Sequence, residues 1–141
     1  MKKTIVLFGL VVAAIAMLFM AIIFNSSKDP HSARHAKART TIEQFYNAFK
    51  HNIGDTIPYL TTSPAYLANY RFYYGDIQGY TISSIKDADS DHKIAVVQVK
   101  TEKSDGSEVT YTDTLQLAEV GGTWLISKYT TNSTEGWPTL P

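Results

Sequence analysis

Residues 94–130, IAVVQVKTEKSDGSEVTYTDTLQLAEVGGTWLISKYT, decide the fold of this chain. Apolar and polar side chains alternate along three runs of this stretch: 94–101, 109–119 and 123–130. A period of two is typical of strands that bury one face of a sheet. Glycines at 106 and at 121–122 mark the turns between the runs. The stretch therefore predicts three consecutive antiparallel strands joined by hairpins.

A fourth strand and a long helix are predicted ahead of this stretch. Tyr80, Ile82 and Ile85 continue the alternation before an acidic turn at residues 86–91. In the predicted helix, residues 32–51, the spacing i, i+3, i+4, i+7 gives one apolar stripe: Ile42, Phe45, Tyr46 and Phe49. The first half of this helix has little to bury and is expected to be an exposed stalk.

Two further helical signals lie between the long helix and the first strand. Gly54 suits a left-handed cap that ends the long helix, and Asp55 suits the N-cap of a short helical turn at residues 56–60. Ser63 followed by Pro64 predicts the start of a helix over residues 64–74. The order is helix, short helix, helix and a four-stranded meander, which predicts an α+β domain with helices on one face of a curved antiparallel sheet.

Five segments carry a resemblance to a known superfamily: IEQFYNAF at 42–49, AVVQV at 95–99, the turn glycine at 106, LQL at 115–117 and GTWLI at 122–126. Together they resemble the NTF2-like (cystatin-like) superfamily of cone-shaped domains. Among its members the chain looks most like small membrane-anchored or lipoprotein bacterial domains of unknown function. The anchored VirB8-like subunits of conjugation and type IV secretion are a second relative in architecture.

The chain begins with a segment that predicts a membrane anchor. The twenty residues from Ile5 to Phe24 carry no charge and follow Lys2 and Lys3. As a helix they would be about 30 Å long, which matches the hydrocarbon core of a bilayer. The alternative is a cleaved signal peptide, but the run is longer than the usual apolar region and its end lacks a small-x-small cleavage site. We therefore expect an uncleaved, single-pass signal-anchor in a bacterial cell membrane.

The orientation of this anchor is open to two interpretations. Four basic residues follow the apolar run, and counting them by the positive-inside rule favours a cytoplasmic domain: Lys28, Arg34, Lys37 and Arg39. The Met-Lys-Lys start is instead typical of exported bacterial segments. We expect an extracytoplasmic domain, in which the basic residues contact anionic lipid headgroups.

Composition limits the classes of function. The whole chain has a formal net charge of zero, but residues 40–141 hold seven Lys/Arg and twelve Asp/Glu, for a net charge of −5. An acidic domain without clustered basic residues is a poor nucleic-acid binder. The chain contains no cysteine, which excludes a lipid anchor on Cys and a Cys nucleophile. The predicted organisation is an anchor at 1–24, a basic stalk at 25–37, an NTF2-like domain at 38–130 and a flexible tail at 131–141.

The sequence shows no acid–base constellation. The resemblance implies that enzymes on this fold, such as steroid isomerases and dehydratases, use an Asp base with a His or Tyr inside the cone. Asp113 is the one acid in mid-strand, and alternation with Tyr111 and Leu115 points it towards the apolar face. Because an unpaired buried carboxylate is costly, we expect a bulge or an edge position to turn Asp113 to solvent. No catalytic residue and no cofactor are predicted.

A metal site is not predicted either. His31 and His35 are spaced i, i+4 and could share a metal on one face of the helix. Zinc would need two more ligands, and only Asp29 is near in the sequence. A solvated stalk is the simpler interpretation of the two histidines.

Tyrosine is the unusual component of the composition. The chain has nine tyrosines, and six of them lie between Tyr59 and Tyr80. A buried tyrosine needs a partner for its hydroxyl, so this content suits a semi-polar cavity or a protein interface, although ordinary helix-on-sheet packing is an alternative. The residues expected at such a cavity or interface are Tyr46, Tyr70, Tyr74, Tyr111 and Trp124.

The sequence thus favours a non-enzymatic, membrane-anchored domain that binds or scaffolds other proteins of a cell-envelope assembly, with a protein partner or a second copy contacting residues 64–74. Two alternatives remain. One is a small-ligand binding module, or degenerate enzyme, with a cavity of about 300 Å³ or more inside the cone. The other is a VirB8-like conjugation or secretion subunit.

Overall fold

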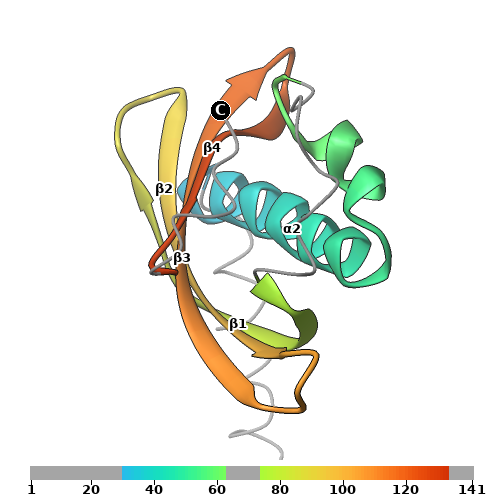
Figure 1. Ribbon diagram of the computed structural model, residues 1–141. Coiled ribbons are helices and arrows are strands. Elements are labelled where there is room, and N and C mark those ends of the chain that lie inside the picture. The colour runs from blue at the N-terminus through green and yellow to red at the C-terminus, as the bar shows by residue number, and fades with distance from the viewer. Residues whose placement is uncertain (1–29, 63–73, 134–141) are drawn as a thin grey trace, which may run out of the picture. The chain divides into compact units, whose positions relative to one another are not determined.

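The computed structural model describes residues 30–62 and 74–133 of the 141-residue chain (Figure 1). The chain divides into two compact units, Met1–Ala36 and Lys37–Pro141. Of the first unit, only the start of a helix is described. The second unit holds the α+β arrangement that the sequence predicts. Its elements are α2 (Pro30–His51, which begins in the first unit), the 3₁₀ helix η1 (Ile53–Tyr59), β1 (Asp76–Asp87), β2 (His92–Glu102), β3 (Glu108–Val120) and β4 (Thr123–Thr131).

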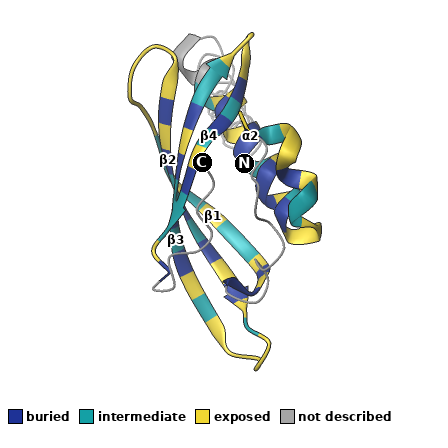
Figure 2. Cartoon of the chain, turned by 45° about the horizontal axis from the view of Figure 1, so that its top comes forward, coloured by how far each residue is buried: buried dark blue, intermediate teal, exposed yellow. Residues whose placement is uncertain are grey.

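The four strands form one antiparallel sheet in the order β1-β2-β3-β4, which confirms the predicted meander. Buried and exposed residues alternate along β2 and β3, as Figure 2 shows. Gly106 and the pair Gly121 and Gly122 have positive φ angles, which lets them close the two predicted hairpins. The pairing of β1 with β2 is interrupted twice by register shifts, and that of β3 with β4 once, after Gln116.

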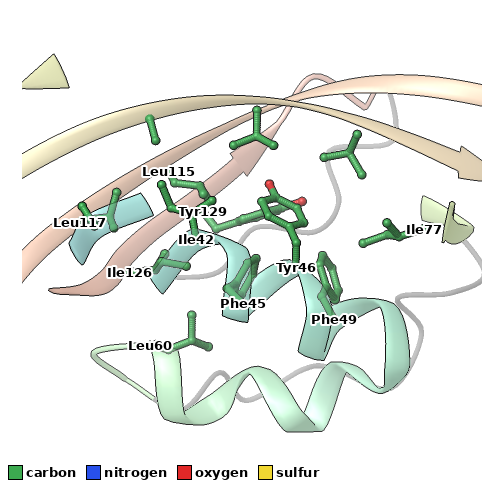
Figure 3. Packing of buried hydrophobic residues seen from close by; sticks show 14 of the residues in the cluster. Ile42, Phe45, Tyr46, Phe49, Leu60, Ile77, Leu115, Leu117, Ile126 and Tyr129 are labelled. Carbon is green, nitrogen blue, oxygen red and sulfur yellow. The ribbon is translucent and has the colours of Figure 1, made fainter. Parts of the chain in front are cut away.

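Helix α2 covers one face of this sheet from Ala38 onward. Ile42, Phe45, Tyr46 and Phe49 are at most 2% exposed, so the predicted stripe is confirmed (Figure 3). Their partners on the sheet are the inward residues of three strands: Ala95, Val97, Val99, Leu115, Leu117, Trp124, Ile126 and Tyr129. Thr41, one helical turn after Ala38, donates a 2.9 Å hydrogen bond from Oγ1 to the Trp124 carbonyl, which ties the helix to β4.

The chain after α2 turns differently from the prediction. The N-cap of the next helix is Asn52, not Asp55, because the Asn52 side chain accepts a hydrogen bond from the Gly54 amide at 3.0 Å. Gly54 is not among the residues with positive φ, so the expected left-handed cap is wrong. An extended Asn52 turns the chain without one. The short helical turn itself is confirmed as η1. After it, Leu60 forms a parallel bridge with Ile126 at the edge of β4.

The C-terminal strand runs slightly further than expected. β4 ends at Thr131, one residue beyond the predicted boundary. Asn132 then pairs with Thr112 of β3: the Thr112 amide donates to Asn132 Oδ1 at 2.8 Å, and the Asn132 amide donates to the Thr112 carbonyl at 3.1 Å. Two strand groups that would otherwise lack partners are thereby satisfied.

Several predicted segments lie outside the described residues. They are the anchor from Ile5 to Phe24, residues 25–29 of the basic stalk, residues 64–73 of the helix predicted at 64–74, and residues 134–141 of the tail. Among the helices that the structure describes, none is both long enough and apolar enough to span a bilayer.

Gly75 fills a position where no larger residue fits. Its φ is +91°, and a Cβ placed there would lie 2.6 Å from the backbone oxygen of Glu102 on the neighbouring strand. Gly106 has a similar φ of +81° but has nothing within 4 Å of such a Cβ. The two positions therefore separate the cost of the backbone conformation from the cost of a collision.

We expect Gly75→Ala to destabilise the fold clearly more than Gly106→Ala. The Gly106 variant carries only the backbone cost of a left-handed residue, about 1–2 kcal/mol, whereas the Gly75 variant must also move β1 away from β2. The midpoint of urea unfolding of the full-length chain measures both losses. Equal losses would contradict the close approach of Gly75 to Glu102.

Candidate functional site

The most polar point inside the domain is the carboxyl group of Asp113. Its Oδ2 accepts hydrogen bonds from the hydroxyls of Tyr46 and Tyr74, each at 2.7 Å, and of Tyr129 at 2.5 Å. Tyr46 comes from α2, Tyr74 lies just before β1, and Tyr129 is on β4. Figure 3 shows the rings of Tyr46 and Tyr129 meeting between helix and sheet. We call Asp113 and these residues the three-tyrosine cluster.

None of the four side chains reaches solvent. Asp113, Tyr46, Tyr74 and Tyr129 are all 0% exposed. The expectation that a bulge or edge turns Asp113 to solvent is therefore wrong, while the alternation that pointed it inward is right. The physical reason is that three hydroxyl donors offset much of the cost of removing the carboxyl group from water.

The second carboxyl oxygen has a different environment. Within the described residues, Asp113 Oδ1 and the hydroxyl of Thr131 are buried and form no hydrogen bond of normal geometry with another group. Thr131 is the residue paired with Asp113 across β3 and β4. The carboxyl group thus has one oxygen with three hydrogen-bond donors and one oxygen with no such partner among the described residues.

Burial controls the electrostatics of the cluster. It raises the pKa of Asp113, and the hydrogen bonds from Tyr129, Tyr74 and Tyr46, together with the hydroxyl of Thr131, only partly oppose it. Burial, followed by the neighbouring phenols and Asp113, raises the pKa of Tyr129 well above its usual range. Tyr129 therefore remains a protonated hydrogen-bond donor under all ordinary conditions.

A shell of aromatic rings fixes the tyrosines in place. Tyr46 stacks on Tyr80 with ring centroids 5.0 Å apart, and Tyr74 stacks on Tyr111 at 4.7 Å. The exposed side of Tyr111 lies under the Lys103 ammonium, 5.4 Å from the ring centroid. Three of the predicted site residues, Tyr46, Tyr74 and Tyr111, are thus brought together.

Of the other two predicted site residues, one is described and lies at a different point of the core. Trp124 is buried and lies under the ammonium of Lys93, 4.8 Å from the ring centroid. Lys93 is itself 1% exposed and forms an ion pair with Asp87, so this is a separate polar centre. Tyr70 lies outside the described residues.

Sequence reasoning missed Tyr129 and Lys93. Counting by two from Trp124 places Ile126, Lys128 and Thr130 on the inner face and Tyr129 on the outer face. The register shift between Ile126 and Lys128 inserts one residue and reverses this assignment, so Tyr129 points inward. No signal in a single sequence marks that bulge. The inward position of Lys93 follows from alternation with Ala95 and Val97, but a charged residue is not expected there.

A hollow of about 350 Å³ lies on the opposite face of the sheet, not inside the cone. Its lining includes Gln98 and Lys100, which alternate with the buried Val97 and Val99 and so point away from α2. Thr112 donates a 3.1 Å hydrogen bond to the Gln98 side-chain oxygen and holds that amide in place. This hollow lies at a different place from the ligand cavity expected inside the cone.

The chemistry available to the three-tyrosine cluster is limited. A general base must come within hydrogen-bond reach of the proton it removes from a substrate. Asp113 is enclosed, and all three phenols already use their protons on Oδ2. In the described part of the chain, no three His, Asp or Glu side chains gather as a metal site would require. The side chains of residues 30–34, including His31, are not described.

Comparison with known proteins identifies the fold. No family model matches the chain, and no curated protein matches its sequence. An NTF2-like protein of unknown function from Shewanella oneidensis MR-1 superposes with a TM-score of 0.56 and 13% identity, covering 70% of this chain and 98% of the other. An NTF2-like protein involved in plasmid conjugation superposes with a TM-score of 0.51 and 17% identity, covering 77% of this chain. This chain matches only 42% of that protein's length. The chain therefore has the NTF2-like fold that its sequence resembles.

Removing single hydroxyls tests the cluster. We expect Tyr46→Phe, Tyr74→Phe and Tyr129→Phe each to lower the free energy of unfolding by about 1–3 kcal/mol, because each leaves the buried carboxyl group with one donor fewer. Urea unfolding of the full-length chain measures the loss.

Tyr80→Phe is the matched control for this series. Its ring also packs on the core, but its hydroxyl bonds at 3.3 Å to the Glu43 carbonyl near the surface, where water can replace it. A loss below about 0.5 kcal/mol is expected, because Tyr80 is half-buried and water can replace the partner of its hydroxyl. If the three cluster variants were as harmless as this control, the tyrosines would not be satisfying Asp113.

Proposed function

We propose that this NTF2-like chain is a non-catalytic binding or scaffolding domain, anchored in a bacterial cell membrane and serving a cell-envelope assembly. The observation that carries the proposal is the enclosed state of Asp113. An enzyme on this fold needs its cone acid to meet a substrate, whereas here the acid and its three donors are 0% exposed and bonded to one another.

The rest of the interior supports the same conclusion. The side chains expected to line a ligand cavity instead fill the space between α2 and the sheet: Tyr46 and Tyr74 bond Asp113, and Tyr111 closes over Tyr74. Because these interior side chains pack against one another, we expect the domain to bind its partners through its surface. A surface that binds other proteins needs no reactive groups, only complementary shape and exposed side chains.

The proposed anchor rests on the sequence from Ile5 to Phe24, which is uncharged and long enough to cross a bilayer as a helix. The basic residues that follow it suit contact with anionic headgroups. A domain held at the membrane surface by its N-terminus meets partners of the envelope at high effective concentration.

A conjugation or secretion role of the VirB8-like kind is the second candidate. It is favoured by the likeness to the NTF2-like protein involved in plasmid conjugation, which shares the fold at 17% identity. Membrane anchoring and a non-catalytic domain suit this candidate equally. The identity of the partner separates it from other envelope assemblies.

Site-specific photocrosslinking in membranes tests the binding role. A photoreactive residue at Tyr70, in the predicted contact segment, or at Gln98, on the outer face of the sheet, should give a discrete adduct with a protein partner or a second copy. The same residue at Asp105, at a hairpin tip, is the control. The adduct should persist in Asp113→Asn, because the interior acid has no part in binding. Recovery of monomer alone from both test positions would count against the proposal.

The orientation of the domain is tested by fusions at Pro141. We expect an alkaline phosphatase fusion to be active, because this enzyme folds only after export, and a green fluorescent protein fusion to be dark. A bright fluorescent fusion with an inactive phosphatase would place the domain in the cytoplasm and remove the envelope partners from reach.

A further inference from the structure

The hydrogen atoms of the three-tyrosine cluster can be counted. Each phenol has one hydroxyl proton, and the three distances to Asp113 Oδ2 lie between 2.5 and 2.7 Å. If each phenol donates, Oδ2 receives three protons and Oδ1 none. Among the described residues Oδ1 has no hydrogen-bond partner, and the hydroxyl of Thr131, the residue paired with Asp113, acts on this carboxyl group and can itself accept a hydrogen bond. A proton on Oδ1 would fit this arrangement without disturbing any tyrosine.

Among the described residues, no positively charged group acts on the carboxyl group of Asp113. The groups that act on Asp113 come from α2, from the residue before β1 and from β4, and all are neutral hydroxyls: Tyr46, Tyr74, Tyr129 and Thr131. Asp113 is paired with Val97 on the neighbouring strand β2, and it is flanked by Tyr111 and Leu115 along its own strand, β3. The lysines on this sheet with described ion pairs are engaged elsewhere, Lys93 with Asp87 and Lys100 with Glu108.

We propose that Asp113 is held as a neutral carboxylic acid in the folded domain, with its proton on Oδ1 towards Thr131, so that the three-tyrosine cluster is a proton-dependent latch between α2 and the sheet. The proton is a ligand of the fold: it binds where the helix, the start of β1 and the end of β4 meet. Loss of the proton leaves an anion to which no described residue brings a counter-charge, and this weakens the packing of the helix on the sheet.

The direction of the pH effect follows from the direction of the pKa change. Burial raises the pKa of Asp113 in the folded state. An acid whose pKa is raised by folding stabilises the fold fully at pH values below its pKa in the unfolded chain, near 3.9. This stabilisation is lost as the pH rises through its pKa in the folded state. Between the two values, each pH unit lowers the folding equilibrium constant about tenfold. Salt-bridged carboxylates behave in the opposite way, because their pKa is lowered.

The test compares urea unfolding of the full-length chain and of Asp113→Asn from pH 5 to pH 8. The asparagine copies the neutral acid: its oxygen accepts from tyrosines and its amide donates to Thr131. The native chain should lose stability relative to the variant as the pH rises, so that the difference between their midpoints shifts steadily in favour of the variant. Taking the difference removes the contributions of groups that both proteins share.

Asp105→Asn is the matched control. Asp105 is exposed, and hydrogen bonds from Ser107 lower its pKa, so its titration lies below the range of the experiment. This variant should keep the pH dependence of the native chain. A pH dependence of Asp113→Asn identical to that of the native chain would overturn the proposal.

A second measurement covers the case in which Asp113→Asn does not fold. Carboxyl ¹³C resonances of the native chain report the protonation of each Asp directly. At pH 5 the Asp113 resonance should still have the position of a neutral acid, while the Asp105 resonance has the position of an ionised one. An ionised Asp113 at pH 5 would contradict the proposed latch whatever the stability data show.

Discussion

A carboxyl group placed in an apolar core needs hydrogen-bond donors, and the core of this domain is arranged around that constraint. Asp113 lies in the middle of β3, where alternation of the strand turns it inward. Its Oδ2 is satisfied by tyrosines 67, 39 and 16 positions away in the sequence. The hydrogen bonds therefore join α2, the entry to β1 and the end of β4. A single side chain specifies how three distant segments meet.

Much of the fold could be predicted from the sequence, but the three-tyrosine cluster could not. The apolar stripe of α2 and the alternation of β2 and β3 are local patterns, and local patterns were enough to predict a helix on an antiparallel meander. Whether Asp113 is buried or exposed depends on hydrogen-bond partners far from it in the sequence. Without them, a buried carboxylate looked too costly and a solvent-facing position was the reasonable prediction. The inward position of Tyr129 was harder still to predict, because a bulge in β4 reverses the alternation of inward and outward residues.

The same cluster supports the non-catalytic role proposed for this chain. An acid inside an NTF2-like cone invites comparison with enzymes that place a base there. Access distinguishes the two cases: the carboxyl group here is enclosed by phenols whose rings are fixed by Tyr80 and Tyr111. Groups that would have to be free for chemistry instead hold the helix on the sheet. If the polar groups of the core have a structural role, partners bind at the surface. This is consistent with the binding role proposed for the domain.

The central claim is that Tyr46, Tyr74 and Tyr129 all donate to Asp113 in a site closed to water. Proton NMR of the tyrosine hydroxyls tests it most directly, since such protons are visible only when exchange with solvent is slow. The account predicts three resolved, exchange-protected hydroxyl resonances, assigned by loss of one resonance in each Tyr→Phe variant. Absence of these resonances, because the hydroxyls exchange freely with water, would contradict it.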